Sequence, residues 1–365
     1  MVDKKISVIG LGLIGGSIVK ALKERMNITN IAAVDNNVES LNQALEEGYI
    51  TRGFSKLDEY IFDSDIIFIC TPVSTTISYI KTLKDNVKDN CIITDTSSTK
   101  GNIIDYINSL DNPPCFIGGH PMTGAEKMGF KSSYAHLFEN AYYILSHTKN
   151  STDDHMNTLC EIIEGIGAIP LKLDAQIHDK ITATISHVPH VIASALVNLV
   201  KNSDSEDKKM QTLAAGGFKD ITRIASSSPQ MWENIVLSNS EKIKKILFDF
   251  IETVHSFMEY IDNNDSKNIY NFFESAKLYR DSFSDNQKGL IQPLNELVVD
   301  VIDRPGIIGD IATLLGQNGV NIKNINVSNS REFEQGCLRI TLPDSYSVNI
   351  SYDLLTSKGY TVFKI

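Results

Sequence analysis

The sequence predicts an α/β protein with three parts: an N-terminal Rossmann-type doubly wound sheet, an all-helical middle domain and a C-terminal ferredoxin-like βαββαβ unit. Three observations predict it. Short β-branched runs alternate with helical patterns up to about residue 170, helical patterns alone follow, and a compact mixed unit ends the chain. Short apolar strands separated by helices are typical of a buried parallel sheet, because helices cover both of its faces.

The expected domains are 1–172 for the sheet, 173–285 for the helices and 294–365 for the last unit. The polar stretch SFSDNQKG predicts a linker, placed at 286–293. In the first domain we expect strands at 6–9, 31–34, 66–70, 92–94, 116–117 and 141–146, and a closing helix at 153–165.

In the middle domain, apolar residues recur at helical spacing from Ile181 to Leu199, and Pro189 predicts a kink there. Further helices are expected at 230–260 and 266–279. Apolar stripes of this kind are more often ordinary core, but so much apolar surface also suits a homodimer interface. In the last unit we expect strands at 297–302, 322–327, 338–342 and 360–365, with helices at 306–315 and 350–357.

Composition excludes several classes of protein. The chain of 365 residues has a net charge of −11 and no long basic block, which argues against nucleic-acid binding. Five scattered cysteines without a C-x-x-C pair suggest reduced thiols rather than disulfides or zinc. No signal-peptide pattern is recognised, and no apolar run approaches the roughly 18–20 residues of a membrane span. We therefore expect a cytoplasmic protein that has no membrane partner.

The stretch GLGLIGGS matches G-x-G-x-x-G directly after the first expected strand, with Gly10, Gly12 and Gly15 at the glycine positions. Such glycines allow a tight turn, backbone approach to a pyrophosphate and close helix packing. Asp35 ends the second strand, where a carboxylate accepts hydrogen bonds from a ribose and repels a 2′-phosphate, so NAD is favoured over NADP. The expected cofactor contacts are Gly10, Leu11, Gly12, Leu13, Ile14, Gly15, Asp35, Thr71 and Pro72.

Three polar loops follow expected strands: the one at Thr71-Pro72, then DTSSTK and GGHPMTG. Ligands of doubly wound sheets bind beyond the carboxyl ends of the strands, so these loops are expected to converge there. Together with HDKITATISHVPH and GGFKDITRIASSSPQMW, they give residues 4–291 a resemblance to the prephenate dehydrogenase family. The D-R-P-G-x-x-G stretch and the run GVNI make the last unit similar to an ACT regulatory domain.

The resemblance implies NAD-dependent oxidation and decarboxylation of prephenate. His120 would accept the proton of the substrate hydroxyl, a role that suits a neutral histidine. Ser98 would orient His120 and the substrate. Arg223, one of only seven arginines, would bind a substrate carboxylate, with His190 and Thr123 nearby.

His178 and His187 are expected to be structural. Their spacing, together with that of His190, does not match a helical zinc site, so no metal is expected.

For the ACT unit, the resemblance implies inhibition by L-tyrosine. The expected effector contacts are Asp303, Arg304, Pro305, Gly306, Ile307, Asn321 and Ile322. Three alternatives stay open. Arogenate dehydrogenase shares the reaction, a β-hydroxyacid dehydrogenase would need Lys180 or Lys219, and a non-catalytic nucleotide and amino-acid sensor would need no catalytic residue.

Overall fold

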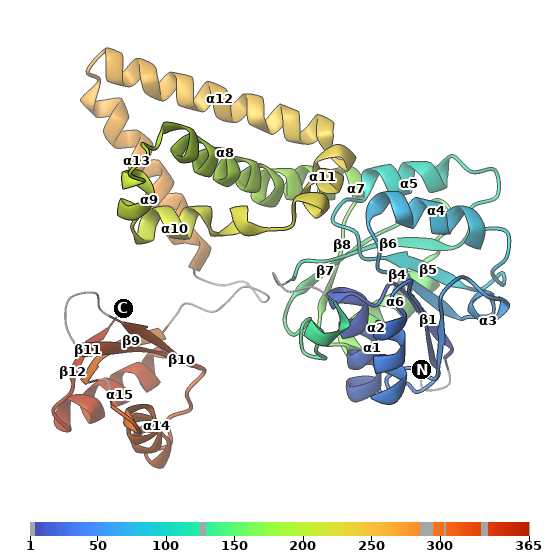
Figure 1. Ribbon diagram of the computed structural model, residues 1–365, viewed down its shortest axis with the longest axis horizontal. Helices are drawn as coiled ribbons and strands as arrows, with labels where there is room; N and C mark the ends of the chain where they lie inside the picture. The colour runs from blue at the N-terminus through green and yellow to red at the C-terminus, as the bar shows by residue number, and fades with distance from the viewer. Residues whose placement is uncertain (1–3, 125–128, 285–294, 303, 330–334, 365) are drawn as a thin grey trace. The chain divides into compact units, whose positions relative to one another are not determined.

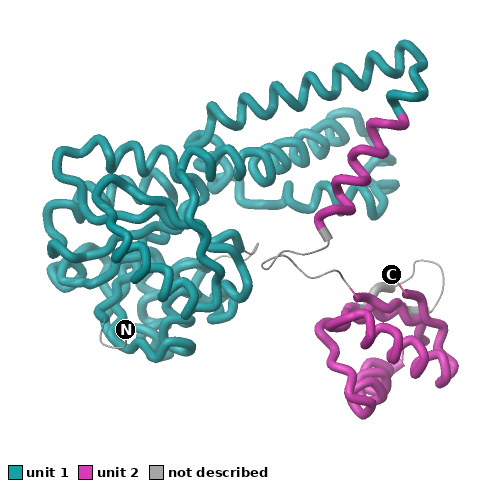
Figure 2. Tube along the Cα trace, turned by 180° about the vertical axis from the view of Figure 1, so that it is seen from behind, with its two compact units in different colours: residues 1–269 teal, residues 270–365 magenta. Residues whose placement is uncertain are grey.

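The computed structural model describes residues 4–124, 129–284, 295–302, 304–329 and 335–364. It has two compact units, 1–269 and 270–365, and the boundary falls inside one helix (Figure 2). The three domain ranges expected from sequence remain predictions, and the expected linker at 286–293 lies outside the described residues.

The first unit contains an eight-stranded sheet in the order β3-β2-β1-β4-β5-β6-β7-β8 (Figure 1). The first six strands in this order run parallel, which confirms the Rossmann-type core; β7 is antiparallel to β6, and β8 is parallel to β7. The strands are β1 Ile6–Ile9, β2 Ile31–Val34, β3 Arg52–Phe54, β4 Ile66–Ile69, β5 Ile92–Asp95, β6 Phe116–Pro121, β7 Tyr142–Ser146 and β8 Ile169–Lys172. β7 runs antiparallel to β6 because a neighbouring strand that follows without a crossover helix must run back along it.

Alternate residues of the central strands enter two different cores, as strand geometry requires. In β4, Ile66 and Phe68 belong to one core, whereas Ile67 and Ile69 belong to the other. The first core is covered by α1 (Leu13–Met26), α2 (Val38–Glu46) and α6 (Asp153–Gly165). The second is covered by α3 (Glu59–Phe62), α4 (Val73–Leu83) and α5 (Gly101–Asn108).

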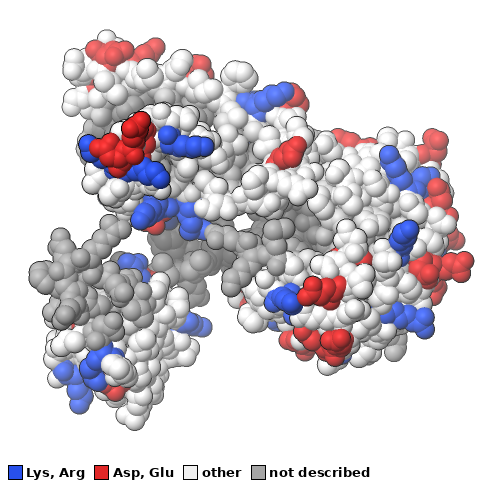
Figure 3. All heavy atoms as spheres, viewed as in Figure 1, with Lys and Arg blue, Asp and Glu red and all other residues white. Residues whose placement is uncertain are grey.

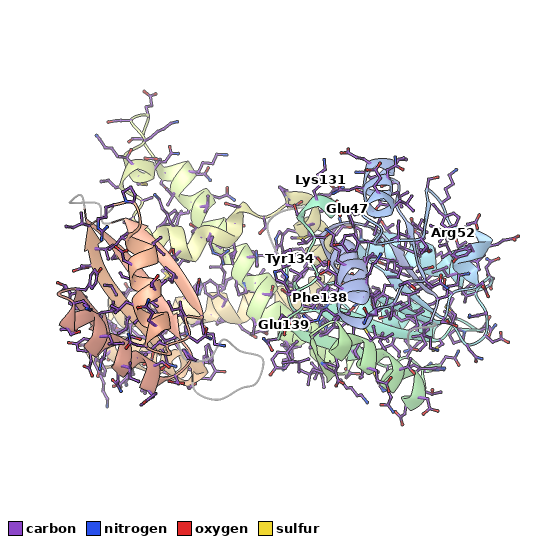
Figure 4. All side chains as sticks on the ribbon, turned by 90° about the horizontal axis from the view of Figure 1, so that it is seen from below. Glu47, Arg52, Lys131, Tyr134, Phe138 and Glu139 are labelled. Atoms are coloured by element: carbon purple, nitrogen blue, oxygen red, sulfur yellow. The ribbon has the colours of Figure 1, made fainter. Side chains whose placement is uncertain are left out.

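Residues 130–139, which precede β7, lie against α1, with Lys131, Tyr134, Phe138 and Glu139 on that side of the unit (Figure 4). It includes the short turn η1 (Phe130–Ser132). Lys20 donates to the Ser133 carbonyl at 3.0 Å, and the Tyr134 N–H donates to Ser17 Oγ at 3.1 Å. These bonds attach residues 133–134, which lie between β6 and β7, to the helix of the glycine loop.

The helical region starts with α7 (Ala175–Thr182), a π-helical turn η2 (Ala183–His187) and α8 (Val188–Ser203). The turn lies where Pro189, which lacks an N–H, was expected to kink the helix, and a local π-turn accommodates such a missing bond. By length and composition alone this stretch could cross a membrane, but residues of α7 hydrogen-bond to the loop before α5 within the same compact unit.

The other helices are α9 Lys209–Leu213, α10 Gly216–Thr222, η3 Arg223–Ser226, α11 Pro229–Ser238, α12 Ser240–Asp262, α13 Ser266–Asp281 and η4 Ser282–Ser284. The expectation of one helix over 230–260 was wrong, because the helix is interrupted at Asn239, between α11 and α12. Its side-chain amide is buried and donates to the Asp179 carbonyl at 2.8 Å. The polar contact at this break links α11 and α12 to α7.

The second unit has a four-stranded antiparallel sheet in the order β10-β11-β9-β12. Its elements are β9 Asn295–Ile302, α14 Ile307–Gln317, β10 Asn324–Asn329, β11 Gln335–Leu342, α15 Ser345–Ser357 and β12 Thr361–Lys364. This order confirms the βαββαβ prediction. Apolar residues from the strands and both helices form one core, including Leu297, Val299, Ile311, Leu315, Ile340 and Leu355.

Candidate active site

The glycine loop joins β1 to α1, and each glycine has its own physical reason. Gly10 has φ +97°, and a Cβ there would lie 2.5 Å from the Cys70 carbonyl oxygen. A Cβ on Gly15 would lie 1.9 Å from the Gly10 carbonyl oxygen. At Gly12, the residue before α1, a Cβ would meet no atom within 4 Å. The open space at the helix N-terminus can therefore take a diphosphate.

Asp35 follows β2 and faces the same loop. Its carboxylate accepts hydrogen bonds from the N–H of Leu11 at 2.6 Å and of Asn37 at 2.7 Å. Thr71 and Pro72 follow β4 next to Gly10, and Pro72 precedes α4. The structure thus brings the residues expected to contact a cofactor to one edge of the sheet.

Behind this edge lies an ion pair between Asp95 and Lys100, both with fully buried side chains. Asp95 also accepts hydrogen bonds from the N–H of Gly119 at 2.9 Å and of Ser97 at 3.0 Å. Burial lowers the pKa of Lys100, although the negative charge of Asp95 opposes this shift. The ion pair joins the two ends of the connection between β5 and α5, and Asp95 links this connection to β6 next to His120.

His120 lies within β6, opposite Ile144 of β7, so the strand expected at 116–117 runs on through the histidine. Its Nδ1 is 2.8 Å from Nε2 of His178, and His178 Nδ1 is 2.8 Å from Asp179 Oδ1. Asp179 in turn accepts the N–H groups of Lys100 and Gly101, both at 2.7 Å. This chain connects β6 to α7 and to the start of α5.

Burial lowers the pKa of His120 well below its usual 6.5, and the charges of His178, Lys100 and His187 act in the same direction. His120 is therefore neutral at neutral pH and keeps a partly exposed edge. Among the described residues, none hydrogen-bonds to its Nε2. A neutral imidazole with an available nitrogen can accept a proton from a ligand.

A second group of residues continues from His187. Asn239 donates to His187 Nδ1 at 3.2 Å, and burial lowers the pKa of His187 to about 4. His190 donates through Nδ1 to the Ser186 carbonyl at 2.9 Å and stacks on Trp232 with 3.8 Å between ring centroids. Burial first, and then the nearby charge of Arg223, lower the pKa of His190. Arg223, at the start of η3, is exposed.

Two of the predicted site residues, Ser98 and Thr123, form no hydrogen bond with His120 among the described residues. In the part of the chain that the structure describes, no hydrogen bond joins Ser98 to His120; the partner of His120 is His178. The hydroxyl of Thr123 donates to the Leu137 carbonyl at 3.3 Å. Sequence reasoning expected His178 to be structural, and only its position next to Asp179 could have suggested otherwise. The described residues contain no group of three or more side chains suited to a metal ion.

In the second unit, Asp303 lies outside the described residues. Arg304 forms an exposed ion pair with Asp310 at 2.6 Å. Gly306 has φ +93° and precedes α14, whereas Ile307 is buried in the core. Pro305 and Asn321 are exposed and Ile322 is half-buried. Residues 304–307 thus lie at the start of α14, whereas Asn321 and Ile322 follow its C-terminal end.

A Rossmann sheet whose open glycine loop lies at the same edge as a neutral histidine defines a nucleotide-dependent oxidoreductase. Comparison with protein families is more specific. Residues 18–171 match the prephenate dehydrogenase nucleotide-binding domain, residues 174–275 match the prephenate dehydrogenase dimerization domain, and residues 295–335 match the ACT domain. The chain belongs to the prephenate dehydrogenase family.

Individual relatives agree. Prephenate dehydrogenase from Bacillus subtilis is 36% identical over 91% of this chain and 90% of its own length. Prephenate dehydrogenase from Lactococcus lactis is 35% identical over 93% of both chains. The crystal structure of prephenate dehydrogenase from A. aeolicus, in complex with hydroxyphenyl propionate and NAD⁺, is 29% identical with a TM-score of 0.73. That likeness covers 78% of this chain and 99% of the other.

Proposed function

We propose that this protein oxidises prephenate with NAD⁺ to 4-hydroxyphenylpyruvate and CO₂, a step toward L-tyrosine. The observation that carries the proposal is the neutral His120, which lies at the same sheet edge as the glycine loop with one ring nitrogen available. The relatives named prephenate dehydrogenase, which match most of the chain, support the same substrate.

The residues at the sheet edge would hold NAD⁺. The space at Gly12 and the free N–H groups that begin α1 suit the diphosphate, and the carboxylate of Asp35 suits the adenosine ribose. Leu11, Leu13 and Ile14 complete the loop, and Thr71 and Pro72 border the nicotinamide side. When bound, NAD⁺ supplies the hydride acceptor.

His120 handles the proton of the substrate hydroxyl. The carbinol C–H bond breaks with loss of a hydride, and the ring carboxylate leaves as CO₂ while its C–C bonding electrons enter the ring. His120 accepts the hydroxyl proton as the carbonyl character of that carbon develops, and returns it to the phenolic oxygen of the product. The overall reaction then consumes and releases no proton.

Arg223, His190 and Thr123 are the residues that we assign to the substrate, and Ser98 to its hydroxyl. An arginine fork binds a carboxylate with two charged hydrogen bonds, and the exposed Arg223 lies close enough to His190 to lower the pKa of its ring. Stacking on Trp232 holds His190 in place. A dianionic substrate thus meets positive charge in an otherwise acidic protein.

We further propose a cytoplasmic homodimer. The family match to a dimerization domain supports the dimer, as do exposed apolar side chains along α12. They include Phe248, Phe250, Ile251, Val254 and Met258. Figure 3 shows that acidic and basic side chains are interspersed on one face of the molecule and leave large uncharged areas. Sedimentation of the whole chain tests this part of the proposal.

The ACT match supports an amino-acid effector, and we propose L-tyrosine as a feedback inhibitor. The expected contacts are the residues around Gly306 and Asn321. In the whole chain, L-tyrosine should lower the initial rate, and Asn321→Ala should weaken that inhibition without changing the uninhibited rate. Equal rates with and without L-tyrosine would contradict the assignment.

Product analysis tests the reaction itself. Purified protein with NAD⁺ and prephenate should form NADH, CO₂ and 4-hydroxyphenylpyruvate in equal amounts, and NADP⁺ should be a poor substitute. NADH formation without CO₂ would indicate a different dehydrogenase, and no turnover with any related substrate would favour the non-catalytic sensor.

A further inference from the structure

We propose that His178 and Asp179 are positioning residues that fix the ring protons of His120, so that Nε2 faces the substrate without a proton. The inference deepens the proposed function, because it explains how His120 is made ready as a proton acceptor. It starts from two hydrogen bonds in series, from His120 to His178 and from His178 to Asp179, both of 2.8 Å.

The proton positions follow from the far end of this chain. Asp179 accepts backbone N–H groups from Lys100 and Gly101 in addition to the His178 ring, and an acceptor with three donors is a carboxylate. Burial alone would raise the pKa of Asp179, but these hydrogen bonds lower it. A carboxylate at this place requires that His178 carry its proton on Nδ1.

The proton positions on His178 then determine those on the ring of His120. A neutral His178 with a proton on Nδ1 has a bare Nε2, which can only accept. His120 must therefore donate from Nδ1, which leaves the proton off its own Nε2. The backbone of Lys100 and Gly101 thus determines, through two side chains, which nitrogen His120 offers to a ligand.

The charges around His120 make Asp179 its effective counter-charge. Asp95, the last residue of β5, and Lys100, the residue before α5, are also close, but they neutralise each other. Tyr143 on β7 is buried, and burial raises its pKa well above 10, so it is uncharged. His187 on η2 has a pKa of about 4 and is neutral. Among the described residues on the elements packed against His120, Asp179 is the remaining negative charge, and it reaches His120 through His178.

This arrangement matters when His120 takes up the hydroxyl proton. The imidazolium formed on His120 is stabilised through His178 by the carboxylate of Asp179, without either bond having to rearrange. A side chain in place of His178 that accepts the hydrogen bond from His120 Nδ1, but has no hydrogen bond to Asp179, should preserve the tautomer of His120. It should lose part of the stabilisation of the imidazolium charge. A side chain that cannot accept this hydrogen bond should lose both the fixed tautomer and the charge stabilisation.

Two substitutions at one position separate these effects. His178→Gln keeps an acceptor for His120 Nδ1–H, whereas His178→Leu does not. We expect kcat to fall about 10-fold in His178→Gln and about 100-fold in His178→Leu, the range expected from one charged hydrogen bond, with KM for NAD⁺ unchanged. His147→Gln is the matched control, since His147 is exposed at the opposite edge of the sheet and bonds only to Ser151 among the described residues.

The pH profile provides the readout that a structural role would not change. In His178→Leu, loss of the hydrogen-bonded route to Asp179 should move the acid limb of kcat/KM to lower pH. A move to higher pH would mean that the positive charge of His178 has the larger effect on His120, and it would overturn the proposal. Equal losses in both variants with an unmoved acid limb would overturn the proposal, as would wild-type kcat in His178→Leu.

Nitrogen-15 NMR of histidine-labelled whole protein tests the tautomer without any turnover. The His120 ring, identified by its loss in His120→Asn, should show a protonated Nδ1 and a bare Nε2 in the wild type, and a mixture of tautomers in His178→Leu. A wild-type His120 protonated on Nε2 would refute the positioning role even if the enzyme oxidises prephenate. Conversely, the expected tautomer in a protein inactive on prephenate would leave this inference standing and overturn the proposed substrate.

Discussion

Asp95 and Lys100 form an ion pair without exposed surface, and Asp95 also binds the backbone N–H of Gly119, the residue before His120. A buried ion pair adds little net stability over an apolar pair of similar volume, but removing one partner leaves the other as an uncompensated buried charge. The pair therefore couples the stability of the unit to the position of β6, the strand that carries His120.

Lys100→Met should lower the free energy of unfolding by about 3–5 kcal/mol, because Asp95 loses its buried counter-ion. Chemical denaturation of the whole chain measures this, with the first transition assigned by tryptophan fluorescence from Trp232. Lys131→Met is the matched control: Lys131 pairs with Glu39 at 3.0 Å, but both side chains are more than two-thirds exposed. It should change stability by less than about 1 kcal/mol. Equal effects of the two substitutions would contradict the account.

Gly12 and Gly15 should fail in different ways when replaced by alanine. At Gly12 the new methyl group meets no protein atom within 4 Å, so Gly12→Ala should fold normally and bind NAD⁺ more weakly by about tenfold or more. At Gly15 it would lie 1.9 Å from the Gly10 carbonyl oxygen, so Gly15→Ala should unfold at a lower temperature. Calorimetric titration with NAD⁺ and thermal unfolding distinguish the two. Unchanged NAD⁺ binding in a folded Gly12→Ala protein would mean that the diphosphate binds elsewhere.

His120→Asn should reduce kcat by about 10²–10⁴-fold, since an amide cannot take up the hydroxyl proton. NAD⁺ affinity should be unchanged, because the described contacts of His120 are with His178 and not with the glycine loop. Steady-state rates and NAD⁺ titration on the same preparation measure both quantities. Substantial turnover in this variant would remove His120 from the reaction.

Acid should destabilise the first unit through its buried histidines. Burial holds the pKa of His187 at about 4, below its ordinary 6.5, so the unfolded chain binds the proton first as pH falls. The stability that neutral His187 contributes is thus complete above about pH 6.5 and is lost toward pH 4, by at most about 3 kcal/mol. His120 acts in the same direction.

The comparison variant is His187→Gln, which keeps an acceptor for Asn239 and has no proton to gain. Its unfolding free energy should depend less on pH than that of the wild type over this range. An identical pH dependence in the two proteins would show that His187 is not the group that titrates.

Much of this fold could be predicted from local sequence. The helix expected at 153–165 matches α6 residue for residue, and the strand at 6–9 matches β1, because apolar periodicity and capping residues are local signals. β3 and β8 were missed: each is short, and only partly buried, so neither has a continuous apolar run. The break at Asn239 was missed because its cause, a hydrogen bond to Asp179, joins residues sixty positions apart.

The candidate site divides in the same way. The glycine loop and Asp35 could be predicted because their residues are close in sequence and have fixed geometric roles. The contact of His120 with His178 could not, since it depends on how α7 packs against β6. The sequence alone does not distinguish the three histidines of this helical stretch. Only the fold shows that His178 contacts His120, His187 contacts Asn239 and His190 stacks on Trp232.

The most direct test of the central claim is the initial rate of NADH formation with NAD⁺ and either prephenate or arogenate, measured side by side on wild type and His120→Asn. The account predicts clear turnover of prephenate, a slower rate with arogenate, and loss of both in the variant. A preference for arogenate would keep the chemistry and change the substrate. Wild-type protein inactive on both substrates would contradict the account.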